Sequence, residues 1–208
     1  MHHTVPILQA DAVSFGYPNS AKKPLFDRLS VSLPPGVTWL CGDEDSGKTS
    51  LLQLLAGALL PTAGQLQIIG VSLTQNRVAY QQQVAWLDPR DSALNEQSAR
   101  QIFAARPGFS PDLLQAHVAG LSLAPHLDKA LYMLSTGTRR KVLIAATLAA
   151  QAPVTLLDQP FMALDHPSIA YLLGVLAEAA RQPGRAWVVA DYEAPLDVKL
   201  AQVIALAV

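Results

Sequence analysis

Residues 42–49 have the residue types and the spacing to bind phosphate. They read Gly-Asp-Glu-Asp-Ser-Gly-Lys-Thr and fit the pattern G-x-x-x-x-G-K-[ST]. In such a loop, backbone N–H groups and a helix N-terminus point at phosphate oxygens. Lys48 would reach the β- and γ-phosphates of a nucleoside triphosphate, and Thr49 would ligate Mg²⁺. The predicted binding residues are Gly42, Asp43, Glu44, Asp45, Ser46, Gly47, Lys48, Thr49 and Ser50.

Three consecutive carboxylates, Asp43, Glu44 and Asp45, make this loop unusually acidic. Negative charge beside a triphosphate opposes binding unless the side chains face solvent. Asp45 also stands where a flexible backbone is favoured, and aspartate tolerates the left-handed region better than most residues. We therefore expect an affinity for triphosphate that is weakened but not abolished.

The loop needs a strand before it and a helix after it. Residues 37–41 form an apolar run typical of a buried strand, and residues 48–56 carry leucines at helical spacing. Strands that alternate with helices along the rest of the chain predict a mainly parallel sheet with helices on both faces. The other expected strands are 7–15, 29–33, 66–69, 84–87, 154–157, 186–190 and 202–206, and the other expected helices are short ones within 92–134 and longer ones over 139–151 and 166–181.

The composition indicates one globular domain of 208 residues, half of them hydrophobic. A net charge of −1 with no basic tract argues against a nucleic-acid partner. No run approaches the roughly 18 apolar residues of a membrane span, and the N-terminus lacks the pattern of a secretory signal. The single cysteine, Cys41, is expected to be a buried structural thiol in a reducing compartment.

Four further segments occur in a characteristic order. Residues 15–17 read Phe-Gly-Tyr, and residues 134–138 read Leu-Ser-Thr-Gly-Thr ahead of an expected helix. Residues 154–158 form an apolar strand that ends in an aspartate, and residues 159–165 read Gln-Pro-Phe-Met-Ala-Leu-Asp. Together with residues 42–49, this set resembles the ATP-binding cassette (ABC) ATPases over essentially the whole chain. The segments resemble an A-loop, an LSGGQ-type signature, a Walker B strand and a D-loop, and residues 42–49 resemble the Walker A loop.

The resemblance implies roles for five residues outside the loop. Tyr17 would stack on adenine, and Asp158 would hold Mg²⁺ through water. Ser135 and Gly137 of the signature would act in trans on nucleotide bound by a second subunit, and Asp165 would lie at the seam between the subunits. The residues alone leave simpler roles open. Tyr17 and Asp158 could be turn residues, and Ser135 and Asp165 could be helix N-caps.

Three positions depart from the ABC pattern where it supports hydrolysis. Gln159 stands in place of the glutamate that serves as general base, and an amide has no useful basicity. Tyr192 stands in place of the H-loop histidine, and residues 88–90 (Asp-Pro-Arg) stand where the Q-loop glutamine is expected. All three positions act on nucleotide held by the chain's own loop. We therefore expect stable ATP binding with weak hydrolysis at this site.

The resemblance also implies a fold. It is the α/β fold of an ABC-type P-loop NTPase, with a mainly parallel sheet flanked by helices. An N-terminal antiparallel β subdomain and a small helical subdomain at about 92–134 complete a single domain over residues 1–208.

The resemblance favours an ATP-binding subunit of an ABC transporter with ATP and Mg²⁺ as cofactors. Such a subunit pairs with a second nucleotide-binding domain, in a homodimer or a heterodimer, and drives transport through a separate membrane permease. It would be cytoplasmic and peripheral on the inner face of the membrane, with the 92–134 segment as its docking face. Two alternatives stay open: a soluble ABC ATPase outside transport, and a regulatory subunit that binds nucleotide without hydrolysing it.

Overall fold

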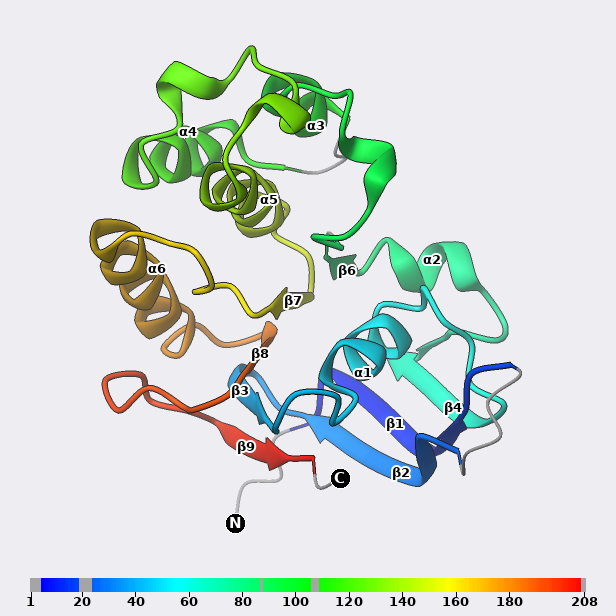
Figure 1. Cartoon of the computed structure of the whole chain (residues 1–208). Helices are drawn as coiled ribbons and strands as arrows, with labels where there is room; N and C mark the ends of the chain where they lie inside the picture. Colours follow the sequence, from blue (N-terminus) through cyan, green and yellow to red (C-terminus); the bar gives the residue numbers. More distant parts are fainter. Residues whose placement is uncertain (1–4, 19–23, 87, 106–108, 207–208) are drawn as a thin grey trace.

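Two β-sheets and a set of helices make up the described part of the chain (Figure 1). The computed structural model describes residues 5–18, 24–86, 88–105 and 109–206. The antiparallel sheet has the order β2-β1-β4-β5, and the parallel sheet has the order β6-β7-β8-β3-β9. The strands of the first sheet are β1 (Leu8–Phe15), β2 (Phe26–Leu33), β4 (Ala63–Ile68) and β5 (Val71–Ser72). Those of the second are β3 (Gly36–Cys41), β6 (Val84–Ala85), β7 (Val154–Asp158), β8 (Ala186–Asp191) and β9 (Gln202–Ala205).

The helices divide into three that flank the sheets and a group of short ones. The flanking helices are α1 (Lys48–Leu55), α5 (Thr136–Ala149) and α6 (His166–Ala179). The short helices and 3-10 turns between β6 and α5 form the region expected at 92–134, which lies apart from the antiparallel sheet (Figure 1). They are η1 (Ser92–Leu94), α3 (Ala99–Ala104), α4 (Pro111–Gly120), η2 (Ala124–His126) and η3 (Leu131–Met133), while α2 (Arg77–Gln81) precedes β6.

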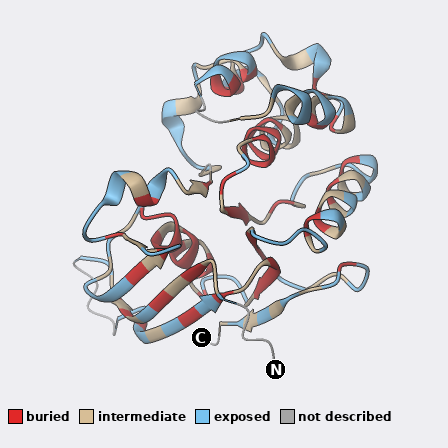
Figure 2. Ribbon diagram, turned by 180° about the vertical axis from the view of Figure 1, so that it is seen from behind, coloured by how far each residue is buried: buried red, intermediate tan, exposed pale blue. Residues whose placement is uncertain are grey.

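The parallel sheet separates two hydrophobic cores, because successive side chains of a strand point to opposite faces. On one face, Leu40 and Val188 pack with α1 and the antiparallel sheet. On the other face, Trp39 and Val189 pack with α5 and α6. Figure 2 shows buried residues concentrated in these strands and on the helix faces turned toward them. The predicted fold, a mainly parallel sheet flanked by helices together with an antiparallel β subdomain, is therefore confirmed.

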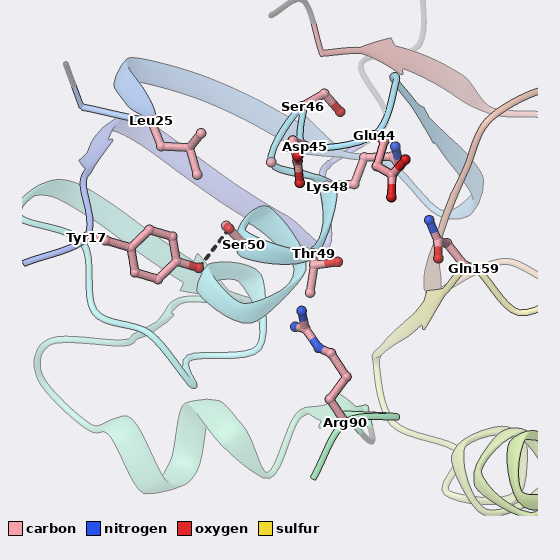
Figure 3. Close-up of a pocket in the computed structure, with 11 residues that line it drawn as sticks. Tyr17, Leu25, Glu44, Asp45, Ser46, Lys48, Thr49, Ser50, Arg90 and Gln159 are labelled. Carbon is pink, nitrogen blue, oxygen red and sulfur yellow. Dashed lines mark hydrogen bonds between the residues drawn. The ribbon is translucent and has the colours of Figure 1, made fainter. Parts of the chain in front are cut away.

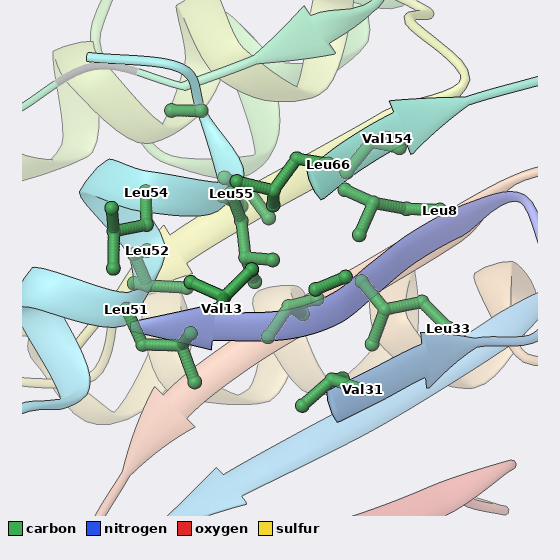
Figure 4. Close-up of a cluster of buried hydrophobic side chains, with 14 of the residues drawn as sticks. Leu8, Val13, Val31, Leu33, Leu51, Leu52, Leu54, Leu55, Leu66 and Val154 are labelled. Carbon is green, nitrogen blue, oxygen red and sulfur yellow. The ribbon is translucent and has the colours of Figure 1, made fainter. Parts of the chain in front are cut away.

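Helix α1 is held between the two sheets by its leucines. Leu51, Leu52, Leu54 and Leu55 are at most 1% exposed and face side chains such as Val13 of β1 (Figure 4). Full burial of a leucine contributes about 1.5–3 kcal/mol. The helix start, and with it the preceding loop, is thus fixed by packing rather than by helix propensity.

Parallel register aligns the ends of three central strands. Asp158 of β7 pairs with Ala190 of β8, which in turn pairs with Leu40 of β3. The next residues of β3 and β8, Cys41 and Asp191, also pair. The carboxyl ends of β3, β7 and β8 therefore meet at one edge of the sheet, where open α/β sheets bind their ligands.

Several elements differ from the sequence expectations. Helix α5 begins at Thr136 rather than 139, since Ser135 caps it. Strand β6 covers only Val84–Ala85, and Leu87 lies outside the described residues. The elements α2 and β5 were not expected at all.

The expectation of a buried Cys41 is wrong. Cys41 is only partly buried, because it ends β3 where the chain turns into the phosphate loop. Burial still raises the pKa of its thiol, and the charge of Lys48 opposes this.

Within the described residues, no helix is both long enough and apolar enough to cross a membrane.

Candidate functional site

The loop between β3 and α1 borders a cavity of about 460 Å³ (Figure 3). Gly47 is the N-cap of α1 with φ 91°, and Asp45 has φ 62°. Both angles lie in the left-handed region, and at Asp45 this is the backbone conformation that the sequence favoured. The cavity is lined by Tyr17, Leu25, Glu44, Asp45, Ser46, Gly47, Lys48, Thr49, Ser50, Arg90 and Gln159.

Lys48 is buried under its own loop. Its Nζ donates to the backbone oxygens of Gly42 and Asp43, the latter at 2.7 Å. The ring of Tyr192 lies against the ammonium, with Nζ 4.9 Å from the ring centroid. Tyr192 therefore reaches the phosphate end of the site by contact with Lys48, although it does not line the cavity itself.

The three carboxylates of the loop are exposed. Asp43, Glu44 and Asp45 all face solvent, which is the arrangement that limits their repulsion of a triphosphate. Ser46 is buried, and its Oγ has no hydrogen-bond partner among the described residues. A hydroxyl donor within the loop that lines the cavity suits a phosphate oxygen.

Thr49 and Asp158 meet below the loop. The Thr49 hydroxyl donates to Asp158 Oδ2 at 2.8 Å, while the buried Oδ1 has no partner in the described part of the chain. Burial raises the pKa of Asp158, and the Thr49 hydrogen bond opposes this shift. An unpaired buried carboxylate oxygen beside a hydroxyl fits Mg²⁺, which binds through one or two protein oxygens plus phosphate and water. The described residues hold no cluster of three or more His, Cys, Asp or Glu that would suggest another metal site.

Tyr17 forms the opposite end of the cavity from Gln159 (Figure 3). Its hydroxyl hydrogen-bonds with Ser50 Oγ at 2.9 Å, and its ring meets that of Phe15 edge-on at 5.0 Å. With 48% exposure, the ring keeps a face for a ligand. The cavity thus joins an aromatic end to a phosphate-binding end.

Gln159 and Arg90 complete the phosphate end. Gln159 has φ 44° and is held by its backbone, whose N–H donates to Ala190 O at 2.8 Å and whose carbonyl accepts from Arg140 Nη1. Arg90 lies on the side of Thr49 (Figure 3). Arg90 was not among the binding residues predicted from the sequence. It lies in residues 88–90, which differ from the expected Q-loop sequence, and that difference was the signal that could have identified it.

The predicted signature residues and Asp165 of the predicted D-loop do not line the cavity. Ser135 caps α5 by accepting from Thr138 N at 3.2 Å. Asp165 caps α6 by accepting from Ser168 N at 2.9 Å, and Lys141 Nζ lies 2.7 Å from its other oxygen. The Lys141 bond, followed by the bonds to Ser168, lowers the pKa of Asp165. The structure therefore shows helix-cap geometry at both residues.

Gly137 packs against the D-loop. A Cβ built there would lie only 2.4 Å from the carbonyl oxygen of Ala163. This close approach joins the start of α5 to the segment before α6. The segments predicted as signature and D-loop therefore lie against each other.

The fold and the site define the class of the protein as a P-loop nucleotide-binding protein. A solved structure of an ATP-binding subunit of an ABC transporter superposes with a TM-score of 0.78 at 20% identity, over 89% of this chain and 79% of that one. The model of the family described as ABC transporter matches residues 26–162. The chain therefore belongs to the ABC transporter family, as an ATP-binding subunit.

Two curated relatives span most of the chain. The cytochrome c biogenesis ATP-binding export protein CcmA of Pseudomonas putida is 33% identical over 77% of this chain and 79% of its own length. The cobalt import ATP-binding protein CbiO of Rhodobacter capsulatus is 30% identical over 97% of this chain and 75% of its own length. Both names describe ATP-binding proteins of transport or export systems.

Proposed function

We propose that this chain binds ATP–Mg²⁺ in the cavity behind the loop, drives transport through a separate permease, and hydrolyses ATP only weakly by itself. ATP would lie between the chain's own Walker motifs and the signature of a partner nucleotide-binding domain. The protein would act on the inner face of the membrane through that permease.

One observation carries the nucleotide assignment. Among the described residues, one buried oxygen of Asp158 has no hydrogen-bond partner, and it lies next to the Thr49 hydroxyl at the start of helix α1. Mg²⁺ bound there would neutralise phosphate charge and satisfy the carboxylate. Tyr17 at the other end of the cavity supports adenine as the base.

The side chains near the terminal phosphate position support weak hydrolysis. Gln159 can hold a water molecule by hydrogen bonding but cannot take its proton. Tyr192 contacts Lys48 through its ring and carries no positive charge. Binding groups are present, and the group that would remove a proton from water is replaced by an amide.

The surface beside the cavity supports a partner domain in trans. Ser135, Gly137 and Asp165 lie outside the cavity, and Asp165 is exposed. Ser135 and Gly137 lie at the N-terminus of α5, where backbone N–H groups suit an anion brought by a second subunit. The signature would thus serve the nucleotide of the partner, whether that partner is a second copy or another cassette.

An apolar groove between α3 and α4 supports the docking of a permease. It has a volume of about 330 Å³ and lies in the region of short helices. Its lining includes Phe103, Leu114, Val118 and Leu127. An apolar groove of this kind suits a hydrophobic element of a partner protein.

Steady-state ATPase measurements on the purified chain test the proposal. We expect Mg²⁺-dependent ATP binding with little turnover in the wild type. Gln159→Glu restores a general base, a group worth about 10²–10⁴-fold, so we expect turnover to rise by at least about tenfold. Gln182→Glu makes the same charge change at an exposed turn and should have no effect.

Two outcomes would count against the proposal in different ways. Brisk turnover by the wild-type chain alone would contradict weak hydrolysis. Absence of Mg²⁺-dependent ATP binding would contradict the nucleotide site itself.

A further inference from the structure

Arg90 is a cation of the cavity that the nucleotide motifs do not account for. We propose that its guanidinium binds the terminal phosphates of the nucleotide and makes binding less dependent on Mg²⁺. The inference rests on the proposed function, since it takes the cavity to hold a nucleoside triphosphate.

The geometry leaves the guanidinium ready for a ligand. Arg90 lines the cavity, and its side chain points toward Thr49 at the start of α1 (Figure 3). Its ion pair with Asp88 is made through Nε at 3.3 Å, and the Arg90 side chain is 62% exposed. Within the described residues, the side-chain hydrogen bond and ion pair of Arg90 both go to Asp88 through Nε. The two terminal nitrogens therefore point to the cavity with their donors available, and an arginine fork matches phosphate oxygens.

Asp88 holds the backbone of Arg90 in place. One carboxylate oxygen of Asp88 accepts from the Arg90 N–H at 2.9 Å, and the other accepts from Gln53 Nε2 at 3.2 Å. Gln53 belongs to α1. The segment that carries Arg90 is thus tied to the helix that follows the phosphate loop, which keeps the guanidinium near the phosphates.

The charges of the cavity make a second cation useful. Two acids, Glu44 and Asp45, and two bases, Lys48 and Arg90, line it. The formal charge of the lining is therefore zero with Arg90 and −1 without it. Lys48 is also engaged with two backbone oxygens of its loop. Arg90 offsets the acidic loop that the sequence predicted would weaken triphosphate binding.

Arg90 and a Mg²⁺ ion at Asp158 would both neutralise the negative charge of the triphosphate. Burial raises the pKa of Asp158, and the positive charge of Arg90 is among the effects that oppose this. Arg90 is thus electrostatically coupled to the carboxylate that would face Mg²⁺. Two cations that neutralise one triphosphate partly replace each other, so loss of either makes binding more dependent on the other.

Equilibrium binding of fluorescent ATP in excess Mg²⁺ and in EDTA tests the proposal. We expect Arg90→Gln to weaken binding about tenfold in EDTA, the size expected for a hydrogen bond to a charged group, and clearly less in Mg²⁺. Arg90→Lys keeps the charge and should restore part of the affinity. Arg181→Gln removes an exposed arginine that is also ion-paired, to Glu178 at 2.9 Å, and should change neither value.

Three other outcomes of this experiment would contradict the proposal. Equal affinity of wild type and Arg90→Gln in EDTA would overturn the proposal. If Arg90→Gln loses the same affinity in Mg²⁺ and in EDTA, the proposal is also overturned. Such a result would indicate a structural role for Arg90, and thermal unfolding of the variant would then show a loss of stability. If the wild type binds no ATP in either buffer, the proposed function fails first, and this inference fails with it.

Discussion

At the end of β7, one carboxylate oxygen of Asp158 accepts a hydrogen bond from the Thr49 hydroxyl, and the other is buried with no partner in the part of the chain that the structure describes. A buried carboxylate in this condition costs folding free energy, since the charged form has lost water without gaining a full set of hydrogen bonds. The cost is acceptable at a binding site, where a ligand supplies the missing interaction. Removal of the Asp158 charge should therefore stabilise the folded protein and weaken its binding of Mg²⁺ and nucleotide.

Replacement of Asp158 by asparagine tests this opposition. The folded-state pKa is raised above the ordinary value, so ionisation at neutral pH opposes folding, and this penalty fades as pH falls through the raised pKa. We expect Asp158→Asn to raise the melting temperature of the nucleotide-free protein at pH 7.5, with the gain shrinking toward pH 4. The gain of ATP affinity on adding Mg²⁺ should fall at least about tenfold.

Asp27→Asn is the matched control for that experiment, because Asp27 lies exposed on β2. It should leave both the melting temperature and the Mg²⁺ effect unchanged. Equal melting temperatures of wild type and Asp158→Asn at pH 7.5 would contradict the opposition between stability and binding.

Some site residues could be predicted from the sequence and others could not. Lys48, Thr49 and Asp158 follow from local patterns, because a strand end and a helix start fix where such side chains lie. The contact of Tyr192 with Lys48 depends on the pairing of β3 with β8, which local patterns do not specify. Arg90 was seen only as a departure from a pattern, and its place in the cavity required the structure.

At the level of elements, the start of α5 and the segment before α6 lock together. Gly137 lies where a Cβ would meet the Ala163 carbonyl oxygen at 2.4 Å, and Ala163 itself has φ 61°. Lys141 reaches across from α5 to Asp165, the N-cap of α6. This junction fixes the start of α5, the predicted signature, relative to the segment before α6, the predicted D-loop.

Gly137→Ala should break this junction. Insertion of a methyl group against backbone costs about 1–3 kcal/mol, which corresponds to a drop in melting temperature of roughly 2–12 °C for a domain of this size. Gly174→Ala is the matched control at an exposed position of α6, where a Cβ meets nothing within 4 Å. It should stabilise by about 0.5–1 kcal/mol. If the two substitutions have the same effect on thermal unfolding, the packing of Gly137 is not what holds the junction.

The sequence pattern did not predict the ends of helices or the short helices correctly. The expected helix at 139–151 missed its first turn, because Thr136, Gly137 and Thr138 have weak helix propensity and the Ser135 cap overrides it. Helix α2 was missed because its five residues show little periodicity, although Asn76 caps it. Short helices are set by caps and tertiary contacts more than by an apolar pattern.

At the scale of the whole molecule, one parallel sheet places the site. Its strands are apolar on both faces, so the sequence could predict a covered sheet but not the order of its strands. The order β6-β7-β8-β3-β9 brings the ends of β7 and β8 beside the phosphate loop after β3. Asp158, Gln159 and Tyr192 reach Thr49 and Lys48 only because of that order.

The central claim is that this site binds ATP–Mg²⁺ and leaves it intact. A single-turnover experiment with protein in excess over γ-labelled ATP measures the fate of the bound nucleotide directly. The account predicts that wild-type protein retains unhydrolysed ATP over a time in which Gln159→Glu converts it to ADP and phosphate. Cleavage by the wild type as fast as by Gln159→Glu would contradict the account.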